Sequence, residues 1–393
     1  MILSADKFGY YTVGDLKTYS KLEAIEWHQR WGQFPEWNFN SEIFNLTDWR
    51  TEPNKNLWQI YIDRCKQIRD CYDYVVLFYS GGSDSDNILR AWLASGCRID
   101  EIAVQINDEG AKKSVELRSD CDWDLEPELV VKPVISDLQK QGIPFNYREI
   151  DISKLQVNMV ENMTVDYFYF ANTSFSPNNL TKSVFREQIQ DYKDLIHQGK
   201  KLCFVWGSDK PNITFANDSW CFNFTDIHDN CVSPYVQMNY HKGWYDELFY
   251  YTPDMPELIV KQCHVLKNFC ETVHDKQFYQ TKSSNWGYNK TLNMYITEQA
   301  VKKIIYPYWD VNTFVARKPY YGGLRSGFGY LGFSERDRWF FNGNFETSKK
   351  YEKHFYWVLD KLTDNIRDYD WTSQRSTGSQ TIIKGHIQKH YFA

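Results

Sequence analysis

A regular alternation of strand-like and helix-like segments occupies residues 72–206 and restricts the possible folds more than any other feature of the sequence. Its first run is continuously apolar or aromatic, as is typical of a strand buried in a parallel sheet. The predicted strands are Tyr74–Tyr79, Ile102–Ile106, Phe145–Ile150 and Leu202–Trp206. The predicted helices between them are Asp84–Ser95, Pro133–Gln141 and Phe185–Gln198. Because strands separated by helices pair in parallel, we predict an α/β fold with a doubly wound parallel sheet.

The regions on either side of this alternation have less regular patterns, so we divide the chain into three parts. Residues 1–70 are predicted to hold a hairpin and helices, residues 71–215 the core, and residues 216–393 a helical and aromatic-rich region. We expect both flanking regions to be α+β elaborations of the core. The elements predicted in the flanks are a hairpin over Tyr10–Tyr19, helices over Ser20–Arg30, Leu57–Arg69, Met255–Val273 and Tyr351–Tyr369, and an irregular stretch from Pro35 to Pro53.

The composition is that of a folded protein with a substantial core. Of the 393 residues, 42% are hydrophobic and 24% are charged, which excludes a wholly disordered chain. The net charge of −6 gives no global attraction for nucleic acid, so binding of this kind would need a local basic patch. No apolar run is long enough to span a bilayer and no signal-peptide pattern is present, so we expect a cytoplasmic protein without a membrane partner.

The segment Ser80–Ser85, with the sequence SGGSDS, carries the sharpest chemical signal. It lies directly after the first predicted strand and directly before a predicted helix. Two glycines allow a tight turn and a close approach to a ligand, and the N–H groups of such a turn and of a helix N-terminus bind anions. Asp84 within an anion site implies a divalent cation that neutralises its charge. The segment is not a Walker A loop, because no G-x-x-x-x-G-K-[ST] pattern occurs here.

This segment resembles the PP-loop of the N-type ATP pyrophosphatase superfamily, whose SGGxDS signature lies at the same strand–helix junction. The signature matches at Ser80, Gly81, Gly82, Asp84 and Ser85, and the match in context covers about residues 71–215. The resemblance implies an adenine nucleotide alpha hydrolase-like fold that binds ATP and Mg²⁺. It further implies that a substrate oxygen attacks the α phosphate, that pyrophosphate leaves, and that a nucleophile then attacks the adenylated substrate. As a whole, the chain resembles uncharacterised PP-loop proteins of bacteriophages, which would place it in the host cytoplasm.

The resemblance also suggests roles for individual residues. A glycine and an acidic residue follow a later strand in similar enzymes, and here Gly207 and Asp209 follow Leu202–Trp206. We expect Asp84 and Asp209 to hold Mg²⁺ and Lys210 to neutralise charge on the phosphates, so that Asp84 and Lys210 serve catalysis. An ordinary turn at the end of a strand is the alternative for residues 207–211. The expected nucleotide-binding residues are Ser80, Gly81, Gly82, Ser83, Asp84, Ser85, Ile106 and Gly207.

The acceptor of the activated group is not identified by the sequence. A small molecule or a tRNA is expected, with Lys302, Lys318 and Arg325 as cations near its site, although solvated basic residues beside a turn would look the same. The chain lacks a cysteine at position 2 and any C-x-x-C pair, which excludes an N-terminal glutaminase and the cysteine-pair metal sites of the thiolating enzymes. Two alternatives stay open, namely a nucleotide-binding sensor or decoy without turnover and a sulfur-transferring enzyme. Homo-oligomerisation and the role of the C-terminal tail also stay open.

Overall fold

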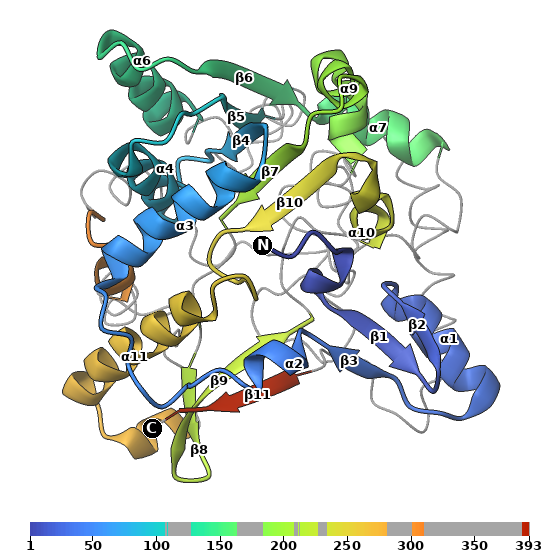
Figure 1. Cartoon of the computed structure of the whole chain (residues 1–393), viewed down its shortest axis with the longest axis vertical. Helices are drawn as coiled ribbons and strands as arrows, with labels where there is room; N and C mark the ends of the chain where they lie inside the picture. Colours follow the sequence, from blue (N-terminus) through green and yellow to red (C-terminus); the bar gives the residue numbers. More distant parts are fainter. Residues whose placement is uncertain are drawn as a thin grey trace, which may run out of the picture.

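The computed structural model describes residues 1–106, 108, 127–162, 184–207, 211, 213–226, 234–280, 301–309 and 387–392. Its centre is a five-stranded sheet in the order β10-β7-β4-β5-β6, in which every neighbouring pair is parallel (Figure 1). The α/β fold with a parallel sheet is therefore confirmed. The strands are β4 (Tyr74–Phe78), β5 (Glu101–Ile106), β6 (Asn146–Asp151), β7 (Leu202–Trp206) and β10 (Trp244–Leu248).

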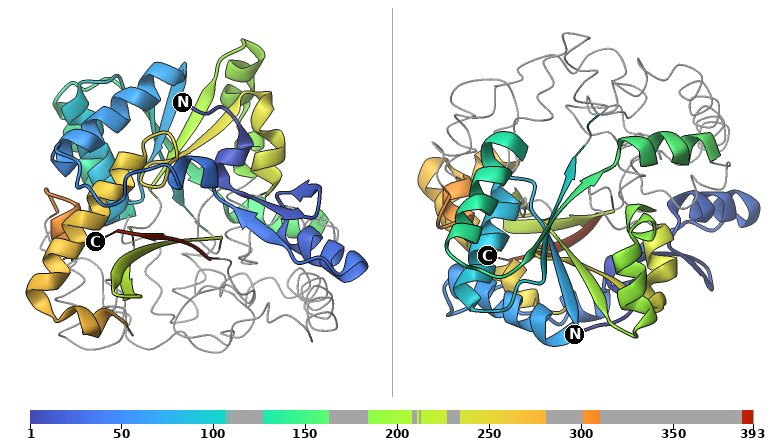
Figure 2. Two further views of the ribbon diagram at one scale, coloured as in Figure 1. Left: turned by 60° about the horizontal axis from the view of Figure 1, so that its bottom comes forward. Right: turned by 90° about the horizontal axis from the view of Figure 1, so that it is seen from above.

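The middle of the sheet is apolar because helices cover both of its faces. Every residue of β7 is buried, and so are Val75, Val76 and Leu77 of β4. Figure 2 shows α3, α4 and α6 on one face and α9 and α10 on the other, which is the doubly wound arrangement. These helices are α3 (Leu57–Cys71), α4 (Ser83–Ser95), α6 (Lys132–Lys140), α9 (Gln190–His197) and α10 (Pro234–Asn239).

The structure corrects one predicted helix in this core and adds another. The helix predicted over Phe185–Gln198 is interrupted at Ile189, whose extended backbone separates a 3-10 turn (Phe185–Gln188) from α9. Arg186 in that turn is held by a buried ion pair with Asp246, at 2.6 Å, which fixes the turn against the sheet. A helix that the sequence patterns did not indicate, α7 (Ser153–Asn162), follows β6.

The central sheet extends beyond the predicted core of residues 71–215, because β10 comes from the predicted C-terminal region. Outside it, the chain forms two small antiparallel sheets with the strand orders β2-β1-β3 and β11-β9-β8. The predicted hairpin is confirmed, and Ser20 caps α1 by accepting a hydrogen bond from the Glu23 N–H at 3.3 Å. The stretch predicted as irregular, Pro35 to Pro53, instead contains β3 and α2. The elements of these regions are β1 (Tyr10–Val13), β2 (Leu16–Thr18), α1 (Lys21–Trp31), β3 (Glu36–Asn38), α2 (Ser41–Phe44), β8 (Ile213–Ala216), β9 (Ser219–Thr225), α11 (Pro256–Val273) and β11 (Ile387–Tyr391).

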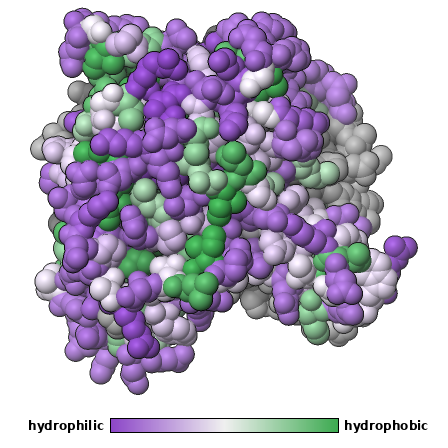
Figure 3. All heavy atoms as spheres, viewed as in Figure 1, coloured by the Kyte–Doolittle hydropathy of each residue, from purple (hydrophilic) through white to green (hydrophobic). Residues whose placement is uncertain are grey.

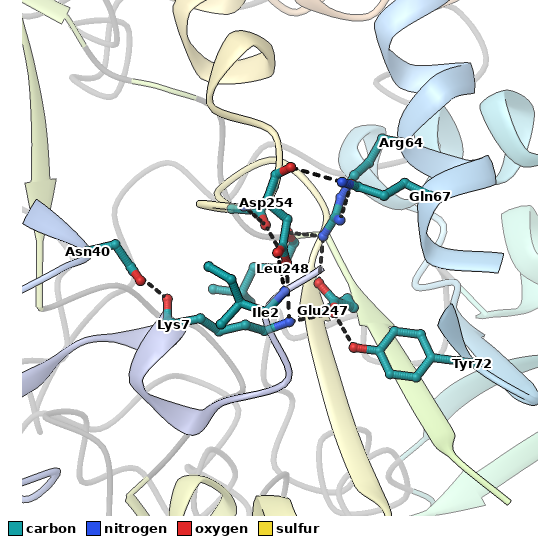
Figure 4. Close-up of polar contacts among 10 residues, drawn as sticks. Ile2, Lys7, Asn40, Arg64, Gln67, Tyr72, Glu247, Leu248 and Asp254 are labelled. Carbon is teal, nitrogen blue, oxygen red and sulfur yellow. Dashed lines mark hydrogen bonds and ion pairs between the residues drawn. The ribbon is translucent and has the colours of Figure 1, made fainter. Parts of the chain in front are cut away.

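A buried cluster of four charged side chains joins the N-terminal segment, α3 and the end of β10. We call Lys7, Arg64, Glu247 and Asp254 the Glu247 cluster (Figure 4). Glu247 pairs with Lys7 at 2.5 Å and with Arg64 at 2.6 Å, and all three side chains are buried. Burial opposes ionisation of Glu247, but the two cations outweigh it and lower the pKa of this carboxyl. The cluster fastens the region before residue 71 to the sheet.

The surface turned toward the viewer in Figure 3 is mainly hydrophilic, with one narrow run of apolar residues near its centre. Leu46, at 88% exposure, is the most exposed large apolar side chain among the described residues. In the part of the chain that the structure describes, no helix combines the length and the apolar character needed to cross a membrane. The helix predicted over Tyr351–Tyr369 lies outside the described residues.

Candidate functional site

The direction in which the chain adds strands to the sheet reverses between β4 and β7. From β4 the chain continues to β5 and β6 on one side, whereas β7 and β10 lie on the other side. Loops that leave the carboxyl ends of two such strands run in opposite directions, and ligands of open α/β sheets bind at this point. The Ser80–Ser85 segment begins at the end of β4, and Gly207 directly follows β7. The loop and Gly207, both expected to bind the nucleotide, therefore follow the two strands at which the strand order reverses.

The turn between β4 and α4 has a shape that requires glycine. Gly81 has a φ of +79°, in the left-handed region, and a Cβ atom there would lie 3.2 Å from Cβ of Val130. Gly82 is the N-cap of α4 and accepts the hydrogen bond of the Asp86 N–H at 3.0 Å. This is the first main-chain hydrogen bond of α4. The N–H groups of Ser83, Asp84 and Ser85 are therefore not used in hydrogen bonds within the helix. The turn and helix start thus present donors of the kind that bind anions.

Two serine hydroxyls hold this turn together. The Ser85 hydroxyl donates to the Gly82 carbonyl oxygen at 3.0 Å and accepts from the Ser80 N–H at 3.2 Å. The Ser80 and Ser85 oxygens lie 3.2 Å apart, and the Ser80 hydroxyl accepts from the Gly82 N–H at 3.4 Å. Ser83 is buried beside them. The loop is therefore preformed by its own side chains, which reduces the ordering that ligand binding requires.

Gly207 lies directly against Asp84. A Cβ atom at Gly207 would stand 3.2 Å from Cβ of Asp84 and 3.3 Å from Cδ1 of Ile88, closer than ordinary contacts. Glycine therefore lets the end of β7 approach the first turn of α4. Asp209 and Lys210, predicted to act beside Asp84, lie outside the described residues.

The predicted adenine position at the end of β5 is occupied by Ile106, which is partly buried. The Ile106 carbonyl accepts from the Ile152 N–H at 3.0 Å, which extends the pairing with β6. The neighbouring Gln105 has a buried side-chain nitrogen without a hydrogen-bond partner in the described part of the chain. A buried amide without a partner is costly, and it marks a place where a ligand acceptor would fit.

Three tyrosines that the sequence analysis did not select surround Asp84, and we call Tyr61, Tyr250 and Tyr306 the tyrosine trio. The Tyr306 hydroxyl donates to Oδ1 of Asp84. The Tyr250 hydroxyl donates to the Asp84 carbonyl oxygen at 2.8 Å and accepts from the Asn87 amide at 2.9 Å. Tyr61 lies on α3, Tyr250 lies just after β10 and Tyr306 lies in the segment 301–309. Regions on both sides of residues 71–215 therefore contribute to the site.

The trio phenols are held in their protonated, donating form. Burial raises the pKa of Tyr306 well above 10, and the negative charge of Asp84 raises it further. Burial also raises the pKa of Tyr250 and of Tyr61, and Asp84 again contributes. Groups with such pKa values donate hydrogen bonds at neutral pH and do not act as bases.

The second carboxylate in the first turn of α4 has a different environment. Asp86 is buried and forms an ion pair with Arg90, one helical turn later, at 2.6 Å. Burial raises the pKa of this carboxyl, although the Arg90 pair opposes the shift. Asp86 is therefore paired within α4, whereas Asp84 lies beside the loop and Gly207.

The oxygen atoms at the loop suit a divalent cation that binds together with a phosphate group. Asp84, Ser80 and Ser85 offer oxygen atoms, which Mg²⁺ prefers. Within the described residues, no group of three or more His, Cys, Asp or Glu side chains could hold a metal alone. This donor set fits Mg²⁺, which is commonly held by one or two carboxylates together with substrate phosphates.

The basic residues predicted near the acceptor site are only partly described. The Lys302 amino group lies over the Trp309 ring, 5.4 Å from its centroid. Lys303 donates to the carbonyl oxygens of Pro307 and Trp309, both at 3.1 Å, and so closes the segment 301–309 on itself. Lys318 and Arg325 lie outside the described residues. The C-terminal tail supplies β11, which pairs with β9.

The described cysteines are free thiols, and most of them are buried. Burial raises the pKa of the Cys65, Cys203 and Cys263 thiols well above 9 and raises that of Cys270 to about 11. Because the thiolate is the reactive form, these four side chains are poor sulfur carriers.

No protein-family model matches the chain, and no curated protein sequence is significantly similar to it.

Proposed function

We propose that the protein binds ATP with Mg²⁺ at the Ser80–Ser85 loop and adenylates a carboxylate or carbonyl oxygen of a substrate, as a PP-loop ATP pyrophosphatase. One observation carries this proposal: the preformed glycine loop follows β4 at the point where the strand order reverses beside β7, with Gly207 against Asp84. An SGGxDS loop at that place in a doubly wound sheet combines an anion site with a carboxylate, which is the requirement for a nucleotide bound with its cation.

The proposed roles follow from this placement. The N–H groups of the loop and of the α4 N-terminus receive the phosphates, while Ser80 and Ser85 keep the loop in shape. Asp84 and Asp209 are the proposed ligands of Mg²⁺, which when bound supplies positive charge to the phosphates. Lys210 is proposed to add to that charge. The adenine is proposed to lie at the end of β5, where the Gln105 amide nitrogen would donate to the base.

The proposed reaction has two steps. A substrate oxygen attacks the α phosphorus, an O–P bond forms, and the bond to the β phosphate breaks to release pyrophosphate. An amine, ammonia or another nucleophile then attacks the activated carbon, and AMP leaves. Positioning and electrostatic stabilisation would supply most of the acceleration. The acceptor, a small molecule or a tRNA, is proposed to bind where residues 216–393 meet the loop, near Tyr250 and Tyr306.

Replacing Ser85 by alanine tests the loop directly. Ser85→Ala removes the hydroxyl that bonds Ser80 and Gly82, and we expect pyrophosphate release to fall roughly 100-fold. The assay would follow pyrophosphate from ATP and Mg²⁺ in the presence of separate small-molecule and tRNA fractions. The matched control is Ser95→Ala, at the far end of α4, where the hydroxyl donates to the Trp92 carbonyl.

The control variant is expected to retain the wild-type rate. Full activity in Ser85→Ala would remove the proposed function. ATP binding by the wild type without pyrophosphate or AMP, in every fraction, would instead favour a nucleotide sensor.

A further inference from the structure

Tyr306 reaches Asp84 from a segment that is remote in the sequence. The side chain is 1% exposed, and its hydroxyl donates to one oxygen of the Asp84 carboxylate. The Tyr250 hydroxyl donates to the main-chain carbonyl of the same residue at 2.8 Å. The side chain and the backbone of this residue are therefore each held by a buried phenol.

The segment 301–309 is itself fixed, so Tyr306 is a rigid donor. The carbonyl of Ile305, its neighbour, accepts from the Tyr61 hydroxyl at 3.0 Å. Lys303 ties the segment to its own end through Pro307 and Trp309. The Tyr250 and Tyr306 rings pack with their centroids 5.7 Å apart. A donor with so little freedom restricts the rotation of the carboxylate that it bonds.

We propose that Tyr306 is a positioning residue, whose phenol holds the Asp84 carboxylate in the orientation that receives the cation accompanying the nucleotide. This inference rests on the proposed function and adds a residue to it. A phenol orients a carboxylate without cancelling its negative charge, so the carboxylate keeps its attraction for a cation. By this account residues 301–309 belong to the nucleotide site.

The Mg²⁺ dependence of ATP binding tests the inference. In Tyr306→Phe, which removes only the hydroxyl, we expect the Mg²⁺ concentration for half-maximal ATP binding to rise about tenfold. Binding of ATP alone, in chelator, is expected to change less than about twofold, because the phosphate donors are untouched. Calorimetric titration of the full chain measures both quantities. The matched control is Tyr279→Phe, a buried tyrosine whose hydroxyl donates to the Cys270 carbonyl at 3.3 Å.

A second readout uses the protein without ATP or Mg²⁺. The thermal midpoints of Tyr306→Phe, Asp84→Asn and the double variant form a cycle, and we expect their effects to be non-additive because the two groups bond each other. If Tyr306→Phe does not fold, Tyr61→Phe takes its place in the titration. It frees the Ile305 carbonyl and is expected to raise the Mg²⁺ requirement by a smaller factor.

The outcomes separate the two proposals. Wild-type protein that binds no ATP with Mg²⁺ would remove the proposed function and this inference together. Wild-type protein that binds ATP with Mg²⁺, while Tyr306→Phe keeps the same Mg²⁺ dependence, would remove the inference alone. Additive thermal midpoints would also overturn it, since Tyr306 would then not act through Asp84.

Discussion

The Glu247 cluster and the tyrosine trio both bring distant segments to the centre of the molecule, but they treat a carboxylate in opposite ways. Glu247 is paired with two cations, Lys7 at 2.5 Å and Arg64 at 2.6 Å. At Asp84, the phenol of Tyr306 donates to the carboxylate and the phenol of Tyr250 donates to the main-chain carbonyl. In an ion pair, the opposite charge offsets the cost of burying a carboxylate. A hydrogen bond from a phenol instead fixes the orientation of the carboxylate. The first arrangement is suited to holding a fold together and the second to holding a ligand group ready.

The two regions are also connected. Glu247 lies near the end of β10, a few residues before Tyr250, and Asp254 follows shortly after. The Asp254 carbonyl accepts from the Gln67 amide at 2.9 Å, and Arg64 bonds Glu247 from the same helix (Figure 4). The segment that carries Tyr250 is therefore fastened to α3 at both ends. This makes the ion-paired cluster a support for the phenol contacts at Asp84.

Breaking the ion-paired region is expected to have the largest effect. Arg64→Met removes one cation from a fully buried cluster, so charge on Glu247 and Asp254 is no longer balanced. We expect a loss of about 3–5 kcal/mol in the free energy of unfolding, measured by urea denaturation. Asp137→Asn is the control, because its pair with Lys140 is exposed and should matter little. Equal stability of the two variants would show that the cluster does not secure the fold.

A pair of glycine variants separates strain from function at the loop. Gly81 and Gly96 have similar positive φ values, +79° and +70°, at the two ends of α4. Alanine at either position is expected to cost about 1–2 kcal/mol of stability from backbone strain. Only Gly81→Ala places a methyl against Val130 beside the loop, so only this variant should lose ATP affinity, about tenfold by calorimetry. Equal ATP affinity in both variants would contradict the placement of the phosphates.

The two regions should also differ in their response to pH. The lowered pKa of Glu247 gives stability that is present above pH 4.5 and is lost as the pH falls below it. The raised pKa of Tyr306 has the opposite effect on the pH dependence. Its contribution to the stability of the protein is present below pH 10 and is lost at higher pH. The expected slope is about 1.4 kcal/mol per pH unit for each group. Unfolding curves of Glu247→Gln and Tyr306→Phe test this, and each should flatten one limb only.

The parts of the fold that were predictable depend on local patterns. The strand β4, the helix α4 and the loop between them are contiguous, and their apolar run, helical stripe and glycines are visible in the sequence. Gly207 was selected from the resemblance, by its position directly after another apolar run. Such features need no knowledge of distant partners.

The parts that were missed depend on partners far away in the chain. The strand β10 carries Asp246 and Glu247, which are typical of a surface, yet both are buried. Their burial is tolerated because Arg186 neutralises Asp246, whereas Lys7 and Arg64 neutralise Glu247. The Tyr306 contact with Asp84 likewise has no local signature, since this sequence contains 28 tyrosines and nothing marks the one that reaches the loop.

The most direct test of the central claim is the product formed from ATP labelled on the α phosphate. Purified protein would be incubated with this ATP, Mg²⁺ and each small-molecule or tRNA fraction, and AMP would be resolved from ADP. The account predicts AMP and pyrophosphate with one fraction, produced by the wild type and by Ser95→Ala but not by Ser85→Ala. Formation of ADP in place of AMP would contradict attack at the α phosphate, and with it the proposed chemistry of the Ser80–Ser85 loop.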